Sequence, residues 1–399
     1  MSAITQNKRG LTVLFTGSIL QLFFGLPYVW SVFVGPVSEF YSWDVDGVKL
    51  TSSFMLGFLV VGILLGGKLQ QKIGAQKVAL LGGLTLAAGM LATAFLPLGH
   101  GQLMYLTYGI AGGFGVGAGY NAIITASQKW FPQNRGFSTG VSVCAFGLST
   151  VIFAPLIETF IKQFGLRNTF LILAGASCVA TLALFGFIRL PEGGAAAGTP
   201  AAALLAKKQY TVTQAIRKKE FYLITLSLMF ATSVFFVLNP SFKLMAAERG
   251  LGASVGTAVV MLTGVANALG RLAAPLLSDK IGREKAAMSI ILLTSLCAFL
   301  LCFAQGYAYM AVIAAAAFCY GGYSGVYPIL TADYFGIQNV GANYGAVMVG
   351  FAISALTFPA MIGLIGSVAV RFVVLGCLAF AGVVMVLLLL RSKKKTAEE

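Results

Sequence analysis

Charge is scarce in this sequence. Only 10% of its 399 residues are charged, whereas 58% are hydrophobic and the mean hydropathy is +0.89. A water-soluble domain normally carries about 25% charged residues to cover its surface. The scarcity of charge excludes an ordinary soluble fold and predicts a membrane protein that crosses the bilayer many times.

Residues that commonly carry enzyme chemistry are also few. The chain has one histidine, His100, and 12 acidic residues, and the sequence shows no group of them that would face a single cavity. The six cysteines fall in predicted helices, without a disulfide framework or metal-ligand spacing. We therefore expect no enzymatic activity, no metal and no cofactor.

Long apolar runs fill most of the chain, and each is long enough to form a helix across a hydrocarbon layer about 30 Å thick. The alternating pattern of a membrane β-barrel is absent. No small-residue cleavage site follows the first run, so we expect the first helix to remain in the membrane. The predicted spans are 11–37, 51–67, 77–97, 101–125, 138–161, 168–189, 220–243, 254–277, 286–305, 307–332, 343–364 and 367–390.

The formal net charge of +15 is distributed unevenly between the two sides of the predicted membrane. If the N-terminus is cytoplasmic, most lysines and arginines of the loops and tails lie on the cytoplasmic side. This asymmetry predicts that both termini are in the cytoplasm and that the protein lies in the inner or plasma membrane. Nucleic-acid binding is not expected, because the basic residues are spread over short loops. The loops of the other side carry only Lys49, Lys162, Arg167, Lys243 and Arg249.

Two segments repeat at a separation of about half the chain. The tripeptide KIG occurs at 72–74 and again at 280–282, and "ITASQKWFPQNRG" from Ile124 is echoed by "LTADYFGIQNVGAN" from Leu330. Parallel repeats of this kind are typical of transporters built from two six-helix halves. We predict an N-terminal half at 1–189, a cytoplasmic linker at 190–219 and a C-terminal half at 220–399.

The loop after the second predicted helix, "GGKLQQKIGAQK", resembles the G-x-L-x-D-R-x-G-R signature of the major facilitator superfamily. Gly67, Leu69 and Gly74 match the signature. Gln71, however, stands where the family has an acidic residue. The resemblance implies the major facilitator fold, an all-α membrane protein with twelve transmembrane helices in two pseudo-symmetric six-helix halves.

The second-half copy of this loop keeps the charged residues. Asp279 and Arg283 match the signature, while Pro275 occupies the glycine position. In the family this loop carries a salt bridge that locks one conformational state. The resemblance therefore implies that Asp279 and Arg283 form a conformational lock, and that Gln71 removes the acid from the first-half counterpart.

Two further segments are similar to more particular relatives. "NRGFSTGVSVCAFG" from Asn134 and "GAGYNAIITASQKWFP" from Gly117 resemble monocarboxylate transporters and oxalate–formate antiporters. Both groups place an arginine that pairs with substrate in the eighth helix, at the position of Arg271. The resemblance implies a bacterial-type monocarboxylate transporter.

Arg271 also stands out on physical grounds. Its position eight residues before Asp279 places it ~12 Å from the loop at 1.5 Å per residue, too deep for the loop's water. Ionisable residues at such depth usually face a cavity, although an arginine can also snorkel to the interface. Asn267 lies one turn earlier on the same face. Because a guanidinium offers two parallel N–H donors, the pair predicts a binding site for a carboxylate.

Several more polar residues lie near the predicted centres of helices. Tyrosines at this depth cannot belong to an interfacial belt, so their hydroxyl groups need partners. They either line the substrate cavity or join neighbouring helices, and the sequence leaves both interpretations open. The related oxalate antiporter also has tyrosines at the positions of Tyr28 and Tyr120. The candidates are Tyr28, Tyr120, Asn121, Tyr320, Tyr323 and Tyr327.

Phe351 distinguishes this chain from the oxalate antiporter. That relative has a second cation in the eleventh helix, eight residues after the start of an NYG sequence. Here "NYGAVMVGF" begins at Asn343 and reaches Phe351 at the same position. We therefore predict that a single carboxylate is recognised and that Phe351 meets the apolar end of the substrate.

Together these patterns predict an alternating-access carrier of small monocarboxylates, such as lactate or pyruvate, that moves a proton with the anion and acts as a monomer in the bilayer. Animal monocarboxylate transporters have an aspartate where this chain has Asn267, which cannot titrate, so the group that carries the proton stays open. Two alternatives also stay open: oxalate–formate exchange, and a sensor that does not transport.

Overall fold

The computed structural model describes residues 3–191, 209–239, 245, 248–251 and 253–398. Every regular element in these residues is helical. Most of the predicted linker lies outside the described residues. The first-half elements are α1 (Ala3–Phe24), η1 (Leu26–Val29), α2 (Trp30–Tyr41), α3 (Val45–Ile73), α4 (Ala75–Ala94), η2 (Gly101–Leu103), η3 (Tyr105–Gly112), α5 (Gly113–Trp130), α6 (Arg135–Leu184) and η4 (Phe185–Phe187).

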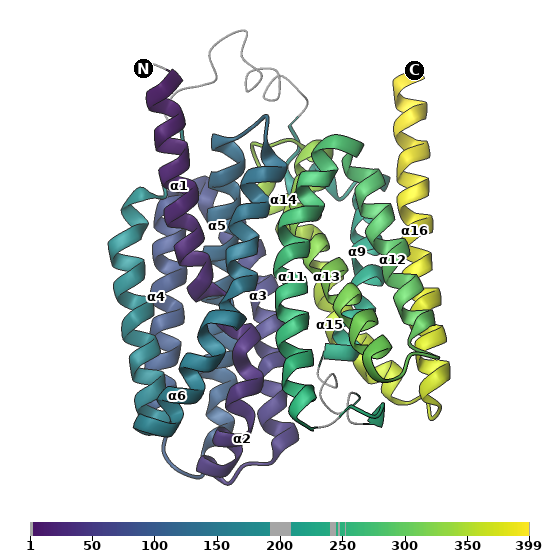
Figure 1. Ribbon diagram of the computed structural model, residues 1–399. Helices are drawn as coiled ribbons and strands as arrows, with labels where there is room; N and C mark the ends of the chain where they lie inside the picture. Colours follow the sequence, from purple (N-terminus) through teal and green to yellow (C-terminus); the bar gives the residue numbers. More distant parts are fainter. Residues whose placement is uncertain (1–2, 192–208, 240–244, 246–247, 252, 399) are drawn as a thin grey trace. The chain divides into compact units, whose positions relative to one another are not determined.

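The remaining elements follow the linker (Figure 1). A capping box at Thr211 and Gln214 begins the short helix α8, in which each side chain bonds the other residue's backbone N–H. The second-half elements are α8 (Val212–Ala215), α9 (Lys219–Leu238), α11 (Ala253–Ile281), α12 (Arg283–Leu300), α13 (Gly306–Phe335), α14 (Val340–Val347), α15 (Val349–Gly363) and α16 (Val368–Glu398).

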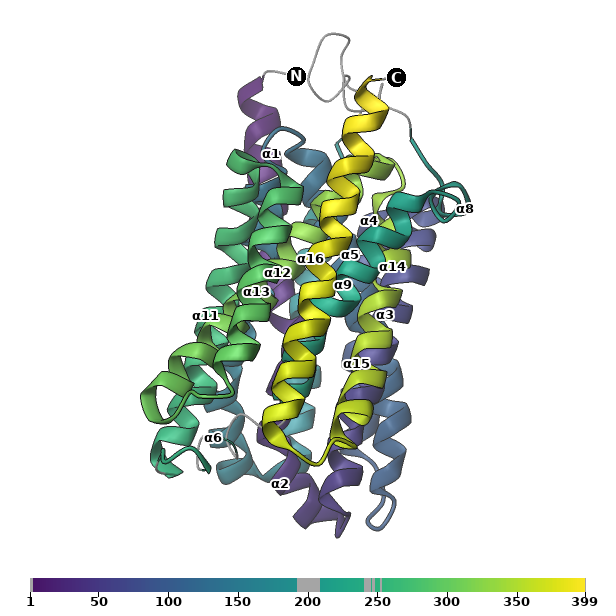
Figure 2. The same cartoon turned by 90° about the vertical axis from the view of Figure 1, so that its right-hand side faces the viewer.

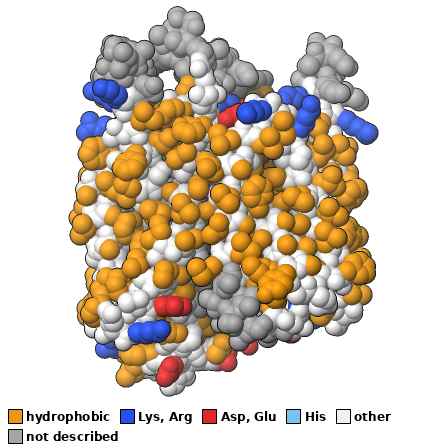
Figure 3. Space-filling view, in the orientation of Figure 1, with side chains coloured by type: hydrophobic (Ala, Val, Ile, Leu, Met, Phe, Trp, Pro, Cys, Tyr) orange, Lys and Arg blue, Asp and Glu red, His pale blue; other side chains and the backbone are white. Residues whose placement is uncertain are grey.

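The helices form the twelve membrane passes that the sequence predicts. Among the described residues, eight helical segments are long and apolar enough to cross a membrane. One of these, Arg135–Phe187, contains two passes, because Gly165 breaks α6 with a φ of 78°. The other passes are η3 with α5, α11 and α12. On the face shown in Figure 3, hydrophobic side chains cover the middle and charged ones gather toward the helix ends, as a bilayer requires.

The chain forms two compact units. Unit 1 comprises Met1–Gln133, Leu148–Lys207 and Asn339–Gly345. Unit 2 comprises Asn134–Gly147, Lys208–Gln338 and Ala346–Glu399. Each unit thus contains most of one predicted half together with a short segment of the other. The first-half segment in unit 2, 134–147, is one of the two segments whose sequences resemble the monocarboxylate transporters.

Small residues allow the helices of unit 1 to pack closely. A Cβ atom at Gly117 in α5 would lie 1.9 Å from the carbonyl oxygen of Leu59 in α3. A Cβ atom at Gly115 would lie 2.5 Å from the carbonyl oxygen of Gly82 in α4. Glycine is needed at both positions, because lipid gives helices little hydrophobic reason to associate and close backbone contact must hold them together.

Helix α16 covers one side of unit 2. It packs along α9 and α12, as Figure 2 shows for the long C-terminal helix. Ser295 of α12 donates a hydrogen bond to the carbonyl oxygen of Gly376 in α16, at 2.8 Å. Helices α11 and α13 pack against each other in the same unit and carry the residues of the candidate site.

Candidate substrate site and charged network

Arg271 lies inside the protein. Its side chain is 1% exposed, and α11 presents it to other residues of unit 2. A guanidinium keeps its proton at any ordinary pH, so a buried cation is fixed at this position. Arg271 is therefore buried among protein atoms, and its contact with substrate stays a prediction.

Polar and aromatic contacts hold the guanidinium group. Nε donates a hydrogen bond to Oδ1 of Asn267 at 2.8 Å, and Nη1 lies 3.5 Å from the carbonyl oxygen of Val143. The ring of Phe146 stands over the group, with its centroid 5.2 Å from Cζ. Asn267 thus shares a face with Arg271, as the sequence predicts, and its oxygen fixes the direction in which the guanidinium points.

Glycine residues set the spacing between α11 and α13 around this pair. A Cβ atom at Gly321 would lie 2.0 Å from the carbonyl oxygen of Asn267 and 2.9 Å from its Oδ1. A Cβ atom at Gly270 would lie 1.9 Å from the carbonyl oxygen of Phe318. The close approach of these two helices is therefore what positions the acceptor of the Arg271 Nε bond.

We expect Gly321→Ala to lower the free energy of unfolding by about 3 kcal/mol, the upper end for overpacking, because both backbones must move apart. Gly175→Ala is the matched control, since a Cβ there would meet no atom within 4 Å. Thermal unfolding of the purified variants measures the difference. Equal midpoints of thermal unfolding for the two variants would show that the interface between α11 and α13 can accommodate a methyl group at position 321.

An aromatic cluster lies in the same unit and consists of Phe235, Phe236, Tyr320 and Phe351. The rings of Phe235 and Tyr320 stack with centroids 3.7 Å apart and an interplanar angle of 7°. Phe351 meets Phe236 edge to face at 4.7 Å and lies 6.4 Å from Tyr320. The sequence predicts Tyr320 and Phe351 as site residues but not Phe235 and Phe236, whose only signal is that two phenylalanines are adjacent in one helix.

Tyr323 and Tyr327 have hydrogen-bond partners in neighbouring helices. The Tyr327 hydroxyl lies 2.8 Å from Oγ of Ser227 in α9. The Tyr323 hydroxyl donates to the carbonyl oxygen of Ile290 at 3.3 Å and also pairs with Thr294, both in α12. These bonds are of the helix-joining kind that the sequence left open, and a role for either tyrosine in substrate binding stays a prediction.

The other three candidates belong to unit 1. Tyr28 lies in η1, the short 3-10 segment between α1 and α2, and Tyr120 and Asn121 lie in α5. The amide nitrogen of Asn121 donates to the carbonyl oxygens of Ile63 and Gly341, each at 2.8 Å. Asn121 therefore joins α5 to α3 and to the segment 339–345. Its contact with substrate, like that of the two tyrosines, stays a prediction.

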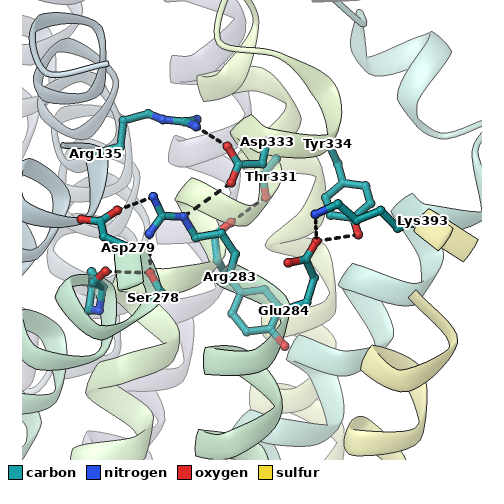
Figure 4. Close-up of polar contacts among 11 residues, drawn as sticks. Arg135, Ser278, Asp279, Arg283, Glu284, Thr331, Asp333, Tyr334 and Lys393 are labelled. Atoms are coloured by element: carbon teal, nitrogen blue, oxygen red, sulfur yellow. Dashed lines mark hydrogen bonds and ion pairs between the residues drawn. The ribbon is translucent and has the colours of Figure 1, made fainter. Parts of the chain in front are cut away.

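A charged network connects the ends of four helices in unit 2 (Figure 4). Arg283 pairs with Asp279, as the loop signature predicts, and its Nε lies 3.5 Å from Oδ2 of Asp333. Arg135 pairs with the other oxygen of Asp333. Nη1 of Arg283 also donates to Oγ of Ser278 at 2.6 Å. From the sequence, Asp333 is expected to be a gate or structural carboxylate near a helix end, but its pairing with Arg135 is not predicted.

The corresponding contact in unit 1 is neutral. Nε2 of Gln71 donates a hydrogen bond to Oδ1 of Asn339 at 3.0 Å. Gly67 fits against the same segment, because a Cβ there would lie 2.4 Å from the carbonyl oxygen of Gly341. An amide pair thus occupies the place where the superfamily signature has a charged residue.

A second polar group fastens the C-terminal helix beside the network. Glu284 accepts bonds from Lys393 and from the Tyr334 hydroxyl, the latter at 3.0 Å (Figure 4). Ser392 donates a hydrogen bond to Glu220 at 2.7 Å. Burial alone would raise the pKa of the Glu284 carboxyl, but the Lys393 ammonium and the Tyr334 hydroxyl lower it below its usual value. Glu284 therefore stays ionised near neutral pH.

Comparison with known proteins identifies the family. Residues 11–331 and 224–399 match the family model of the Major Facilitator Superfamily. The chain belongs to this superfamily. It is therefore a multi-pass membrane transport protein and not an enzyme.

Among curated relatives, the chain is 28% identical to the Uncharacterized MFS-type transporter YhjX of Escherichia coli, over 88% of this chain and 87% of the relative. It is 26% identical to the oxalate:formate antiporter of Oxalobacter formigenes, over 80% and 76%. It is also 26% identical to apicoplast pyruvate carrier 1 of Toxoplasma gondii, over 75% and 66%.

The fold is also that of a solved transporter. The crystal structure of the fucose:proton symporter FucP of E. coli aligns with a TM-score of 0.71 over 95% of this chain and 98% of that one. The sequence identity is 12%, so this similarity concerns the fold alone. It agrees with the arrangement of twelve helices in two halves predicted from the repeats.

Proposed function

We propose that this protein carries small monocarboxylates, such as lactate and pyruvate, across the cell membrane by alternating access, together with a proton. The observation that carries the proposal is the buried guanidinium of Arg271, oriented by Asn267. A fixed cation with parallel N–H donors matches a carboxylate in charge and shape. The names of two relatives, an oxalate:formate antiporter and a pyruvate carrier, support a carboxylate substrate.

The aromatic cluster supports a substrate with one charged and one apolar end. Phe351 and Tyr320 lie in the same unit as Arg271. The resemblance to the oxalate antiporter implies that a second cation of that relative corresponds to Phe351. A dianion that faced Arg271 alone would leave one carboxylate desolvated, a penalty of several kcal/mol. The methyl end of lactate or pyruvate would instead lie favourably against an aromatic ring.

The proposal also covers the orientation of the protein in the membrane and the conformational lock formed by Asp279 and Arg283. The excess of lysine and arginine in one set of loops favours cytoplasmic termini, in the inner or plasma membrane. Asp279 and Arg283, with Arg135 and Asp333, would then lock one conformation at the cytoplasmic ends of their helices. We infer a monomer, and we keep Tyr28, Tyr120 and Asn121 as predicted substrate-binding residues.

Uptake of labelled lactate into proteoliposomes tests the function. We expect an inward-directed proton gradient to drive uptake, and we expect pyruvate to compete well. Oxalate should compete at least tenfold more weakly than pyruvate. Its second carboxylate would be unpaired, and each ~1.4 kcal/mol of binding free energy lost changes the affinity by a factor of ten. Uptake that follows membrane potential and ignores the pH gradient would contradict proton coupling.

The variant Phe351→Lys distinguishes monocarboxylate transport from the alternative function, oxalate–formate exchange. The name of one relative, an oxalate:formate antiporter, supports this alternative. Restoring a second cation should increase competition by oxalate and reduce transport of lactate. Strong oxalate competition in the unmodified protein would establish this alternative instead. Absence of uptake for every acid tested would favour the sensor interpretation.

A further inference from the structure

Phe146 of α6 covers the guanidinium of Arg271. Its side chain is 2% exposed, and its ring centroid lies 5.2 Å from Cζ of Arg271. Val143, nearly one turn earlier, presents its carbonyl oxygen to Nη1. Gly147 follows Phe146 in the chain, and a Cβ atom on it would lie 2.9 Å from Cδ of Arg271. One turn of α6 is therefore shaped around this arginine.

The contacts made by Phe146 and Asn267 are neutral. A carboxylate at either position would neutralise the guanidinium and compete with an anionic substrate. The face of an aromatic ring instead attracts a cation through its quadrupole and carries no net charge. An amide oxygen likewise accepts a hydrogen bond without cancelling the charge. Both contacts stabilise the buried cation without neutralising its charge.

We propose that Phe146 is a positioning residue for substrate recognition: its ring stabilises the buried charge of the Arg271 guanidinium and fixes its direction, so that it can bind a carboxylate. The proposal rests on the proposed function for the identity of the anion. It assigns to the segment 134–147 a part in the substrate site, beyond its part in the charged network through Arg135.

Fluorination of Phe146 tests this role, because it weakens the ring quadrupole while keeping nearly the same shape. Phenylalanine with one, two and three fluorine atoms is introduced at position 146 by amber suppression. We expect the KM for labelled lactate to rise stepwise, to about tenfold for the trifluoro ring, with little change in the maximal rate. A role in packing alone would leave KM constant along the series.

Phe33 provides a matched control in unit 1. It is 1% exposed and stacks on the rings of Phe170 and Trp30, with centroids 4.9 and 5.7 Å away. The same fluorinated series at Phe33 should leave KM unchanged. A constant KM at Phe146 in a protein that transports lactate would overturn the proposal.

A measurement without substrate distinguishes failure of this proposal from failure of the proposed function. We expect the fluorinated series at Phe146 to lower the unfolding midpoint stepwise in the otherwise unmodified protein, and to have no such effect in an Arg271→Met background. If this coupling is present but no acid is transported, the contact with Arg271 stands and the monocarboxylate function falls. If the midpoint is constant in both backgrounds, the inference about Phe146 is wrong.

Discussion

Arg271→Ala is expected to leave a folded protein that no longer transports monocarboxylates. The substrate carboxylate would enter a site from which the buried cation has been removed, and it would be desolvated without a partner. A penalty of several kcal/mol corresponds to a loss of about a thousandfold or more in transport. Arg271→Lys should restore little, because an ammonium cannot offer two parallel donors or keep the Nε bond to Asn267.

Initial rates of lactate uptake in proteoliposomes measure this effect, and thermal unfolding confirms that the variant is folded. Arg371 is the matched control. Its Nε donates to the carbonyl oxygen of Ile365 at 2.6 Å and its Nη2 to that of Gly363 at 3.3 Å, at the end of α15. Arg371→Ala should therefore reduce stability slightly and retain transport. Normal uptake by Arg271→Ala would refute the assignment of the substrate site.

The second large effect is expected at Asp333. Its two carboxylate oxygens face Arg135 and Arg283, whose side chains are only 7% and 12% exposed. Asp333→Ala would leave two nearly buried cations facing each other. Breaking a fully buried pair costs about 3–5 kcal/mol, and the partial exposure of Asp333 reduces our expectation to about 2 kcal/mol.

The midpoint of thermal unfolding in detergent measures this loss. The variant Asp333→Asn removes the negative charge but keeps nearly the same side-chain shape, so it shows how much of the loss is due to charge. The matched control is Asp46→Asn, because Asp46 pairs with Lys49 at 3.0 Å but its side chain is 85% exposed. Exposed pairs contribute about 0–1 kcal/mol, so the control should unfold close to the unmodified protein. Equal midpoints for Asp333→Ala and Asp46→Asn would mean that the network contributes nothing to stability.

The local parts of the site are those that the sequence alone predicts. Arg271 and Asn267 are four residues apart in one helix, and helical periodicity places such a pair on one face whatever surrounds the helix. Asp279 and Arg283 are also four residues apart, but α11 ends at Ile281 and Arg283 begins α12, so their pairing follows from the resemblance to the loop signature. The structure confirms both pairs.

The same holds for the fold as a whole. The length and spacing of the apolar runs predict twelve helices, because a bilayer of fixed thickness demands a fixed length of apolar chain. The echo of KIG at 72–74 and 280–282 predicts two related halves. Neither inference requires knowledge of which side chains touch.

Only the tertiary structure decides which helices meet. Arg135 and Asp333 are separated by 198 residues, and nothing in their local sequence pairs them. Phe146 covers Arg271 only because the segment 134–147 belongs to unit 2, which consists mostly of the second half of the chain. Asn121 reaches Gly341 only because the segment 339–345 belongs to unit 1.

The physical reason lies in the solvent. In water, an apolar stripe shows which face of a helix is buried, whereas lipid is as apolar as leucine and leaves both faces alike in sequence. Partners are then chosen by close contact at small residues such as Gly117 and Gly321, and by hydrogen bonds between single polar groups. Hydropathy therefore determined that this chain spans the membrane twelve times, and close packing determined which residues surround Arg271.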